Sequence, residues 1–222
     1  MEHPIKVFPF MALPRVVFFP NTYLNLYIFE EHYKKMLKSA IENSQPVGIF
    51  LARQSGSLRR MFSSCERIGT FGEIVKFEKL PRGNSFITLY GVLRGVLTQV
   101  IRIEPFPLAQ VQVCSEQIAI ASGNVLENTL KEMINLIQRF EPSSERRTIP
   151  LPPKRNQEKL FLSLVNSIAA MLPADPLKKQ DWLSEENVIR RYELIKDELM
   201  RLLTFNRLVE LVTPLMENPE LN

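Results

Sequence analysis

Residues 13–37, LPRVVFFPNTYLNLYIFEEHYKKML, carry the most informative pattern of this chain. It begins with a short apolar bend between Pro14 and Pro20, continues as a run of β-forming residues and ends with a segment of helical periodicity. Each proline fixes its own backbone φ and removes an N–H donor, so we expect strand pairing to stop on either side of the bend. Three interpretations of this stretch are open: a targeting segment, a catalytic loop, or the first half of a folded binding module.

The composition indicates a globular protein: of the 222 residues, 45% are hydrophobic and 23% are charged, which excludes a disordered or fibrous chain. A formal net charge of +4 permits contact with nucleic acid but does not require it. The first 20 residues contain an acid and four prolines, unlike a signal peptide. No window approaches the ~20 apolar residues of a membrane helix. Cys65 and Cys114 are expected to be reduced thiols, so we expect a cytoplasmic protein without membrane contact.

The first half of the chain has the pattern of β-strands. Val75 and Phe77, for example, alternate with charged residues and fall on one face of a predicted strand. One helix is predicted over residues 30–43, where an apolar stripe faces the sheet; the stripe is Tyr33, Met36, Leu37, Ala40 and Ile41. The predicted strands are residues 5–11, 22–29, 46–52, 69–80, 85–91, 96–104 and 109–114, with a turn at 81–84.

The second half changes to helical periodicity, which predicts a helical bundle. We therefore divide the chain into a β-rich subdomain, residues 1–118, and a helical subdomain, residues 119–222. Ser184 is the predicted N-cap of a long helix, and residues 141–156, with four prolines, are predicted to form an exposed connection. The predicted stripes are Leu126, Leu130, Met133, Ile134 and Ile137; then Leu160, Phe161, Leu164, Val165, Ile168 and Leu172; then Val188, Tyr192, Ile195, Leu199, Leu202 and Leu203; and finally Leu208, Leu211, Val212 and Leu215.

Sequence patterns of enzyme chemistry are missing. The chain has no phosphate-binding GxxxxGK[ST] or GxGxxG motif, no HExxH zinc motif and no GxSxG nucleophile motif. Its two histidines, His3 and His32, are expected on the surface. We therefore assign no catalytic, cofactor-binding or metal-binding residue, and expect no cofactor.

Basic residues raise the alternative of RNA binding. Arg53, Arg59, Arg60 and Arg67 surround one predicted loop, and Phe62 interrupts this cluster. A second cluster consists of Arg146, Arg147, Lys154, Arg155 and Lys159. A basic loop with an aromatic residue can bind RNA through phosphate contacts and base stacking. A solvated loop with no ligand explains the same pattern.

Three blocks, in order, resemble the N-terminal domain of Lon proteases. The first carries Leu13-Pro14, Val16 to Pro20, Leu24, Leu26 and Ile28; the second, residues 68–100, carries Gly69-Thr70, Leu80-Pro81, Gly83 and a G-x-x-R turn at Gly91 and Arg94; the third carries Lys179, Gln180, Leu183, Val188, Arg191 and Leu194. The resemblance spans nearly the whole chain. Arg82 departs from the family pattern, in which acidic residues are usual at that turn.

The resemblance implies an α+β fold, with an N-terminal PUA-like β pseudo-barrel, one embedded helix and a C-terminal α-helical bundle. It also implies substrate engagement and assembly of a protease, so the expected partner is an unfolded or extended polypeptide, a partner protein or a second copy. Because no ATPase or Ser-Lys peptidase sequence is present, we expect a stand-alone, non-enzymatic form. The candidate polypeptide-binding residues are Phe18, Phe19, Phe62 and Arg94. This role requires Phe18 or Phe19 to be partly exposed; the alternative is that the apolar bend is core beneath the first helix.

Overall fold

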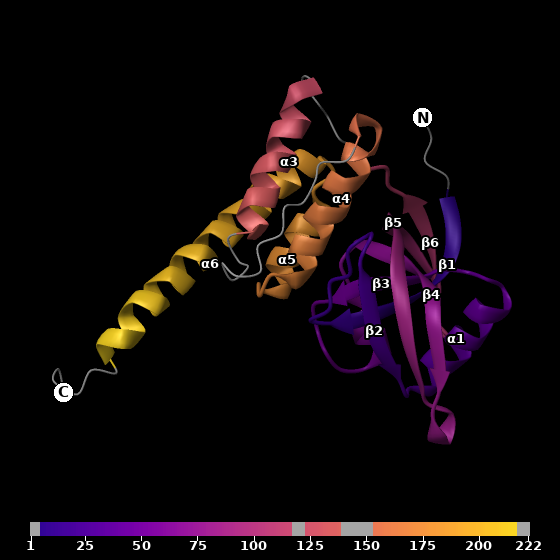
Figure 1. Ribbon diagram of the computed structural model, residues 1–222. Coiled ribbons are helices and arrows are strands. Elements are labelled where there is room, and N and C mark those ends of the chain that lie inside the picture. The colour runs from indigo at the N-terminus through magenta and orange to yellow at the C-terminus, as the bar shows by residue number, and fades with distance from the viewer. Residues whose placement is uncertain (1–4, 117–122, 139–152, 217–222) are drawn as a thin grey trace.

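The computed structural model describes residues 5–116, 123–138 and 153–216. A strand-rich first half and a helical second half lie side by side (Figure 1). The strands are β1 (Ile5–Pro14), β2 (Tyr23–Ile28), β3 (Val47–Ala52), β4 (Ile68–Lys79), β5 (Ser85–Arg102) and β6 (Leu108–Val113). The helices are α1 (Glu31–Glu42), α2 (Leu58–Ser63), α3 (Gly123–Gln138), α4 (Lys154–Met171), α5 (Pro176–Ser184) and α6 (Val188–Met216), and a short 3-10 turn covers Pro81–Gly83. The expected α+β class is confirmed.

The six strands form one sheet in the order β2-β5-β4-β3-β1-β6. Only the β1–β3 ladder is parallel among these pairings. The long strand β5 also pairs with β6, which closes β5, β4, β3, β1 and β6 into a ring and leaves β2 at an edge. The core of this half lies inside the ring and beneath α1 and includes Phe10, Phe50 and Phe71.

The predicted turn at Gly91 and Arg94 is wrong, because both residues lie inside the 18-residue strand β5. The register between β4 and β5 shifts nearby, between Phe71 and Gly72, so the strand bends without breaking. Glycine is needed at position 91 because a Cβ atom there would lie 2.5 Å from the carbonyl oxygen of Phe19. The motif therefore marks a close approach of two backbones.

Helix α1 is confirmed, but it is not the only helix of the first half. The six-residue α2 was missed, because a helix this short shows less than two turns of periodicity. It packs Met61 and Phe62 into the sheet core and places the remaining described residues near the surface. The cluster of Arg59 and Arg60 therefore lies on a helix and not on a loop.

The helical half buries the predicted stripes of α3, α4 and α6 in a second core; the side chains of Ile137, Leu203 and Leu208 onward lie outside the described residues. Ser184 is the last residue of α5, so its assignment as an N-cap is wrong. Asn187 caps α6 instead, since its Oδ1 accepts hydrogen bonds from the backbone N–H of Ile189 at 3.0 Å and of Arg190 at 3.3 Å.

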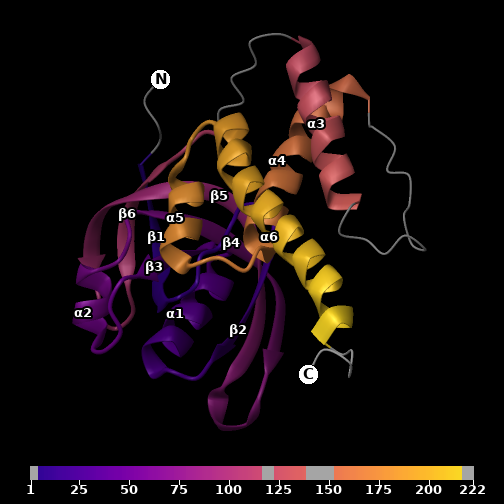
Figure 2. The same ribbon diagram turned by 90° about the vertical axis from the view of Figure 1, so that its left-hand side faces the viewer.

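The predicted connection 141–156 falls mostly outside the described residues, and its last three residues are already helical because α4 begins at Lys154. Strands end at Val113 and helices begin at Gly123. From the helical half, α5 lies against the strands and is seen in front of them in the turned view (Figure 2). The side chain of Gln180 on α5 donates a hydrogen bond of 2.9 Å to the carbonyl oxygen of Ile68 on β4.

Candidate functional site

The apolar bend after β1 holds the two halves together. Phe18 and Phe19 are only 2% and 0% exposed, so of the two alternatives the structure has the bend as core, without the exposed ring that the binding role requires. The Phe18 ring belongs to the sheet core and the Phe19 ring to the helical core. Both carbonyl groups are satisfied: Thr70 Oγ1 donates to Phe18 at 2.6 Å, and Thr22 Oγ1 donates to Phe19 at 2.7 Å. Two consecutive side chains thus enter different cores, which joins the halves at this bend.

Phe62 is also buried, with 4% of its surface exposed and its ring centroid 5.0 Å from that of Phe10. It is therefore not available to stack on a base, and the RNA alternative loses its aromatic group. Of the nearby arginines, Arg53 forms an ion pair with Glu66. The second basic cluster lies largely outside the described residues, although Lys159 is exposed on α4.

Arg94, the last candidate, is buried between the two halves with 1% of its surface exposed. Its Nη1 donates hydrogen bonds to the carbonyl oxygens of Leu183 at 2.7 Å and Glu185 at 3.1 Å, at the end of α5. Its Nε lies 3.3 Å from Glu116 Oε1. Through these contacts the buried Arg94 joins strand β5 to the end of helix α5.

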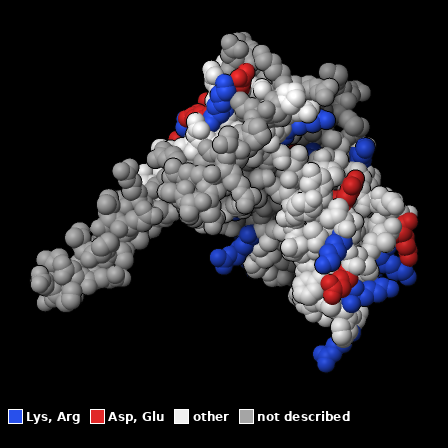
Figure 3. Space-filling view, in the orientation of Figure 1, with Lys and Arg blue, Asp and Glu red and all other residues white. Residues whose placement is uncertain are grey.

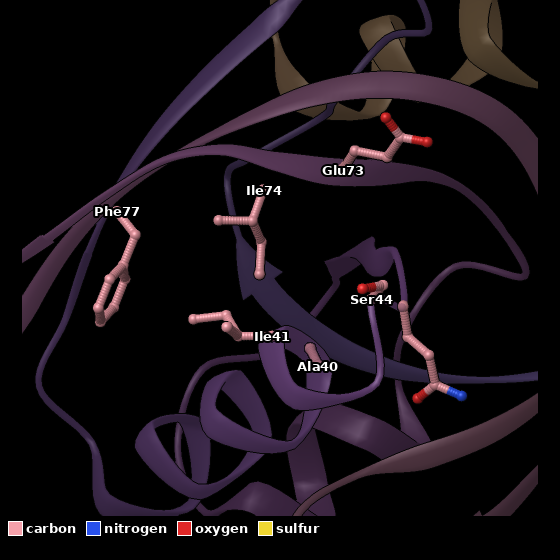
Figure 4. Close-up of a pocket in the computed structure, with 7 residues that line it drawn as sticks. Ala40, Ile41, Ser44, Glu73, Ile74 and Phe77 are labelled. Atoms are coloured by element: carbon pink, nitrogen blue, oxygen red, sulfur yellow. The ribbon is translucent and has the colours of Figure 1, made fainter.

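The structure instead opens an apolar groove between α1 and the β4–β5 hairpin. Ile41 on α1 points across it toward Ile74 and Phe77 on β4 (Figure 4). Ile41 and Phe77 are 42% and 39% exposed, although their neighbours Ala40 and Leu37 are buried. Exposed apolar side chains that line one concave surface are typical of a binding site.

The groove consists of two adjoining cavities of about 400 and 570 Å³ that share Ile41 and Phe77. The larger cavity reaches the hairpin turn, where Lys34 Nζ donates a hydrogen bond of 3.3 Å to the carbonyl oxygen of Arg82 and joins α1 to that turn. Its lining residues are Lys34, Leu37, Lys38, Ile41, Glu42, Phe77, Lys79, Leu80, Gly83, Asn84 and Ser85. The floor is apolar, and three of the four charged residues of the rim are lysines.

Sequence reasoning missed this groove, although it named some of its residues. Ile41 belonged to the helical stripe that was expected to pack on the sheet, and Phe77 belonged to the apolar face of β4. The sequence signal for the groove is the alternation of apolar and charged residues over 73–79. This segment of β4 lies beyond the residues that pair with β3. In this segment β4 pairs only with β5 among the described strands, so no third strand covers that edge.

Acid–base and metal chemistry have few candidates in the described part of the chain. Burial lowers the pKa of His32, and the nearby Glu30 carboxylate opposes that change. Among residues 5–116, 123–138 and 153–216, no three His, Cys, Asp or Glu side chains are grouped as metal ligands. In the same residues, no helix is long and apolar enough to cross a membrane.

Residues 7–201, which include the whole groove, match the family described as the ATP-dependent protease La (LON) substrate-binding domain. The chain belongs to the Lon substrate-binding domain family. The Lon protease of Roseiflexus castenholzii is 31% identical over 108 residues, which make up 49% of this chain and 13% of that protein. Lon protease 2 of Desulfotalea psychrophila is 24% identical over 204 residues, 88% of this chain and 25% of that protein. The chain thus spans 25% or less of these two curated relatives.

Two solved Lon domains share the fold. The N-terminal domain of the Mycobacterium avium complex Lon protease has a TM-score of 0.60 at 14% identity, over 88% of this chain and 98% of that one. The Lon N-terminal domain protein from Xanthomonas campestris has a TM-score of 0.58 at 18% identity, over 86% of this chain and 98% of that one. The Lon architecture thus accounts for both halves of the chain.

Proposed function

We propose that this Lon-type domain acts by binding and not by catalysis, and that it holds extended apolar segments of unfolded polypeptide in the groove between α1 and the β4–β5 hairpin. The observation that carries this proposal is the joint exposure of Ile41 and Phe77 on the floor of one groove. A family described as substrate-binding supports a polypeptide as the ligand, since the substrates of a protease are polypeptides.

The chemistry of the groove suits such a ligand. Its floor offers apolar contact without a deep, closed pocket, so it can accept different side chains. Lys38 and Lys79 on the rim can bind backbone carbonyl groups or acidic side chains of the ligand. Binding is expected to be weak and broad, because an unfolded ligand gives up conformational entropy when it is ordered. Cys65 and Cys114 are both free, which agrees with a proposed cytoplasmic place of action.

Fluorescence anisotropy of a labelled, permanently unfolded polypeptide tests this function. Phe77→Ala should weaken binding by about fivefold to tenfold, because a partly exposed ring contributes part of the ~1.5–3 kcal/mol of a fully buried side chain. Val75→Ala is the matched control: Val75 is an exposed residue of the same strand that does not line the groove.

The proposal also predicts that moderate salt leaves most of the affinity in place, because the floor is apolar. Equal losses in Phe77→Ala and Val75→Ala, with both variants folded, would place the ligand elsewhere. Unchanged binding by a folded Phe77→Ala, Ile41→Ser double variant would overturn the groove as the site.

A further inference from the structure

The edge strand β2 lacks the features that usually keep edge strands from pairing with another chain. Such strands normally carry charges, a proline or a β-bulge. Strand β2 pairs with β5 in an unbroken register from Tyr23 to Ile28, and among the described strands it has no second partner. Its sequence YLNLYI includes no charged residue and no proline. The backbone N–H and C=O groups on one side of this strand are therefore available to pair with another strand.

Both faces of β2 expose apolar side chains to solvent at this edge. On the outer face, Tyr23 and Tyr27 are 70% and 47% exposed. The ring centroid of Tyr23 lies 5.1 Å from that of Tyr90 on β5, and the ring centroid of Tyr27 lies 5.1 Å from that of Phe86 on β5. The surface over β2 and β5 is largely uncharged, whereas charged side chains gather toward β4 and the hairpin turn (Figure 3).

On the inner face, Leu24 and Leu26 pack against the sheet core but remain only partly buried. Their cross-strand neighbours on β5, Leu89 and Ile87, are fully buried. The difference arises because β5 has a strand on each side, whereas β2 has one among the described residues. A further strand at this edge would cover both leucines.

We propose that a second copy of this chain pairs with β2 in antiparallel orientation across a two-fold axis at Asn25. In this register Tyr23 lies opposite Tyr27 of the second copy, and Leu24 lies opposite Leu26 of the second copy. Aromatic side chains then meet on the outer face and leucines on the inner face. A shift by one residue would place aromatic residues opposite leucines on the wrong faces. The strand is thus complementary to itself, as a two-fold interface requires.

The axis position suits Asn25 for a second reason. Asn25 Oδ1 accepts a hydrogen bond of 2.7 Å from Thr88 Oγ1, while no hydrogen bond from its Nδ2 is seen within the described residues. Directly opposite residues of an antiparallel pair lie within side-chain contact. The Nδ2 group is therefore left to donate to an acceptor of the second copy. No charges of like sign meet at this position.

Across the axis, Tyr90 and Tyr23 of one copy continue into Tyr27 and Phe86 of the other as one aromatic row. Cross-strand aromatic pairs are among the favourable contacts of a sheet. The dimer does not depend on the proposed polypeptide groove, because the groove is lined by the inner-face residues Ile74 and Phe77 and β2 contributes nothing to it.

Analytical ultracentrifugation of the whole chain at increasing concentration tests the dimer, with a charge-pair design at the axis. Wild type should shift toward a dimer as concentration rises. Asn25→Lys and Asn25→Asp should each stay monomeric, because like charges then face each other across the axis. An equimolar mixture of the two variants should recover the dimer. Val75→Lys, an exposed change on β4, should dimerise as wild type does.

Disulfide trapping tests the register itself. Asn25→Cys should form a covalent dimer under mild oxidation, whereas Tyr27→Cys should not, since its two copies would lie ~13 Å apart along the strands. Cys65 and Cys114 should not form disulfides in this assay, because the thiolate is the reactive form and burial raises the pKa of both thiols, that of Cys65 to about 11.

A wild type that stays monomeric at every concentration overturns the proposal, as does an Asn25→Lys variant that still dimerises. A monomeric wild type whose binding of unfolded polypeptide is weakened by Asn25→Lys would assign the β2 edge to a client strand instead. Loss of groove binding in Phe77→Ala leaves the dimer result untouched, so the two proposals fail separately.

Discussion

Arg94 and Arg191 bind the two oxygens of one carboxylate, that of Glu116. Arg94 Nε lies 3.3 Å from Oε1, and Arg191 Nη2 lies 2.8 Å from Oε2. Both arginines also donate to the carbonyl oxygen of Glu185. The guanidinium groups are buried, whereas the carboxylate keeps some exposure. Strand β5, the segment after β6 and helix α6 thus meet at one charged cluster, which fixes the helical half against the sheet.

Replacing Arg94 with methionine should destabilise the fold by about 3–5 kcal/mol, because it removes a buried partner of Glu116 and leaves the carbonyl oxygen of Leu183 without its side-chain donor. Urea unfolding followed by the fluorescence of Trp182, the single tryptophan, measures this change. Arg53→Met removes an ion pair whose arginine is exposed and should change stability little. A similar midpoint for both variants would show that the buried cluster does not hold the halves together.

Phe19→Ala should cost about 3–5 kcal/mol, as expected for a large side chain removed from a core. The affinity of the folded variant for unfolded polypeptide should not change, because Phe19 lies in the helical core and does not line the groove. Urea titration and anisotropy on the same preparation measure both quantities. Weaker polypeptide binding by a folded Phe19→Ala would restore the bend as a binding element.

Asn187→Ala should destabilise the protein by about 1 kcal/mol, because two backbone N–H groups at the start of α6 lose their acceptor. Ser184→Ala is the control and should have a smaller effect, since Ser184 closes α5 and caps no helix start. Thermal unfolding by circular dichroism compares the two variants. A larger effect at Ser184 would contradict the observed boundary between the helices.

His32 should make the protein less stable as the pH falls through its titration. Burial lowers the pKa of folded His32 below its unfolded value of about 6.5. The unfolded state therefore takes up the proton first, so this contribution to stability is complete above pH ~6.5 and is lost as the pH falls through the folded pKa. His32→Gln should lose less stability than wild type between about pH 7 and about pH 5.

The Glu30→Gln variant provides the opposing test of the same group. Glu30 lies 3.5 Å from His32 and raises its pKa. Removing that charge should lower the pKa further and steepen the loss of stability over the same pH interval. Urea unfolding at each pH gives the free energy of unfolding for all three proteins. Parallel pH profiles for wild type and His32→Gln would rule out His32 as the titrating group.

Local periodicity was enough to place most elements of this fold. Alternation identified the strands and a helical stripe identified α1, because both patterns arise within a few residues of one another. The elements that were missed are the short or interrupted ones. Helix α2 shows less than two turns of pattern, and the separation of α5 from α6 depends on the cap formed by Asn187.

The site could not be read in the same way. Periodicity shows which side chains share a face, but contacts between distant residues decide whether that face is covered. Phe18 and Phe19 are equally apolar in sequence, and only the packing of the two halves assigns one ring to each core. Ile41 continues the buried stripe of α1, yet it is exposed because the hairpin opposite leaves a groove.

The α+β class, the positions of most strands and helices, and the family of the chain could all be predicted from the sequence. Three features required the packed structure: the burial of Arg94 and Phe62, the groove lined by Ile41 and Phe77, and the open edge at β2. The physical reason is that secondary structure follows from short-range geometry, whereas burial depends on which surfaces meet when segments far apart in the chain pack together.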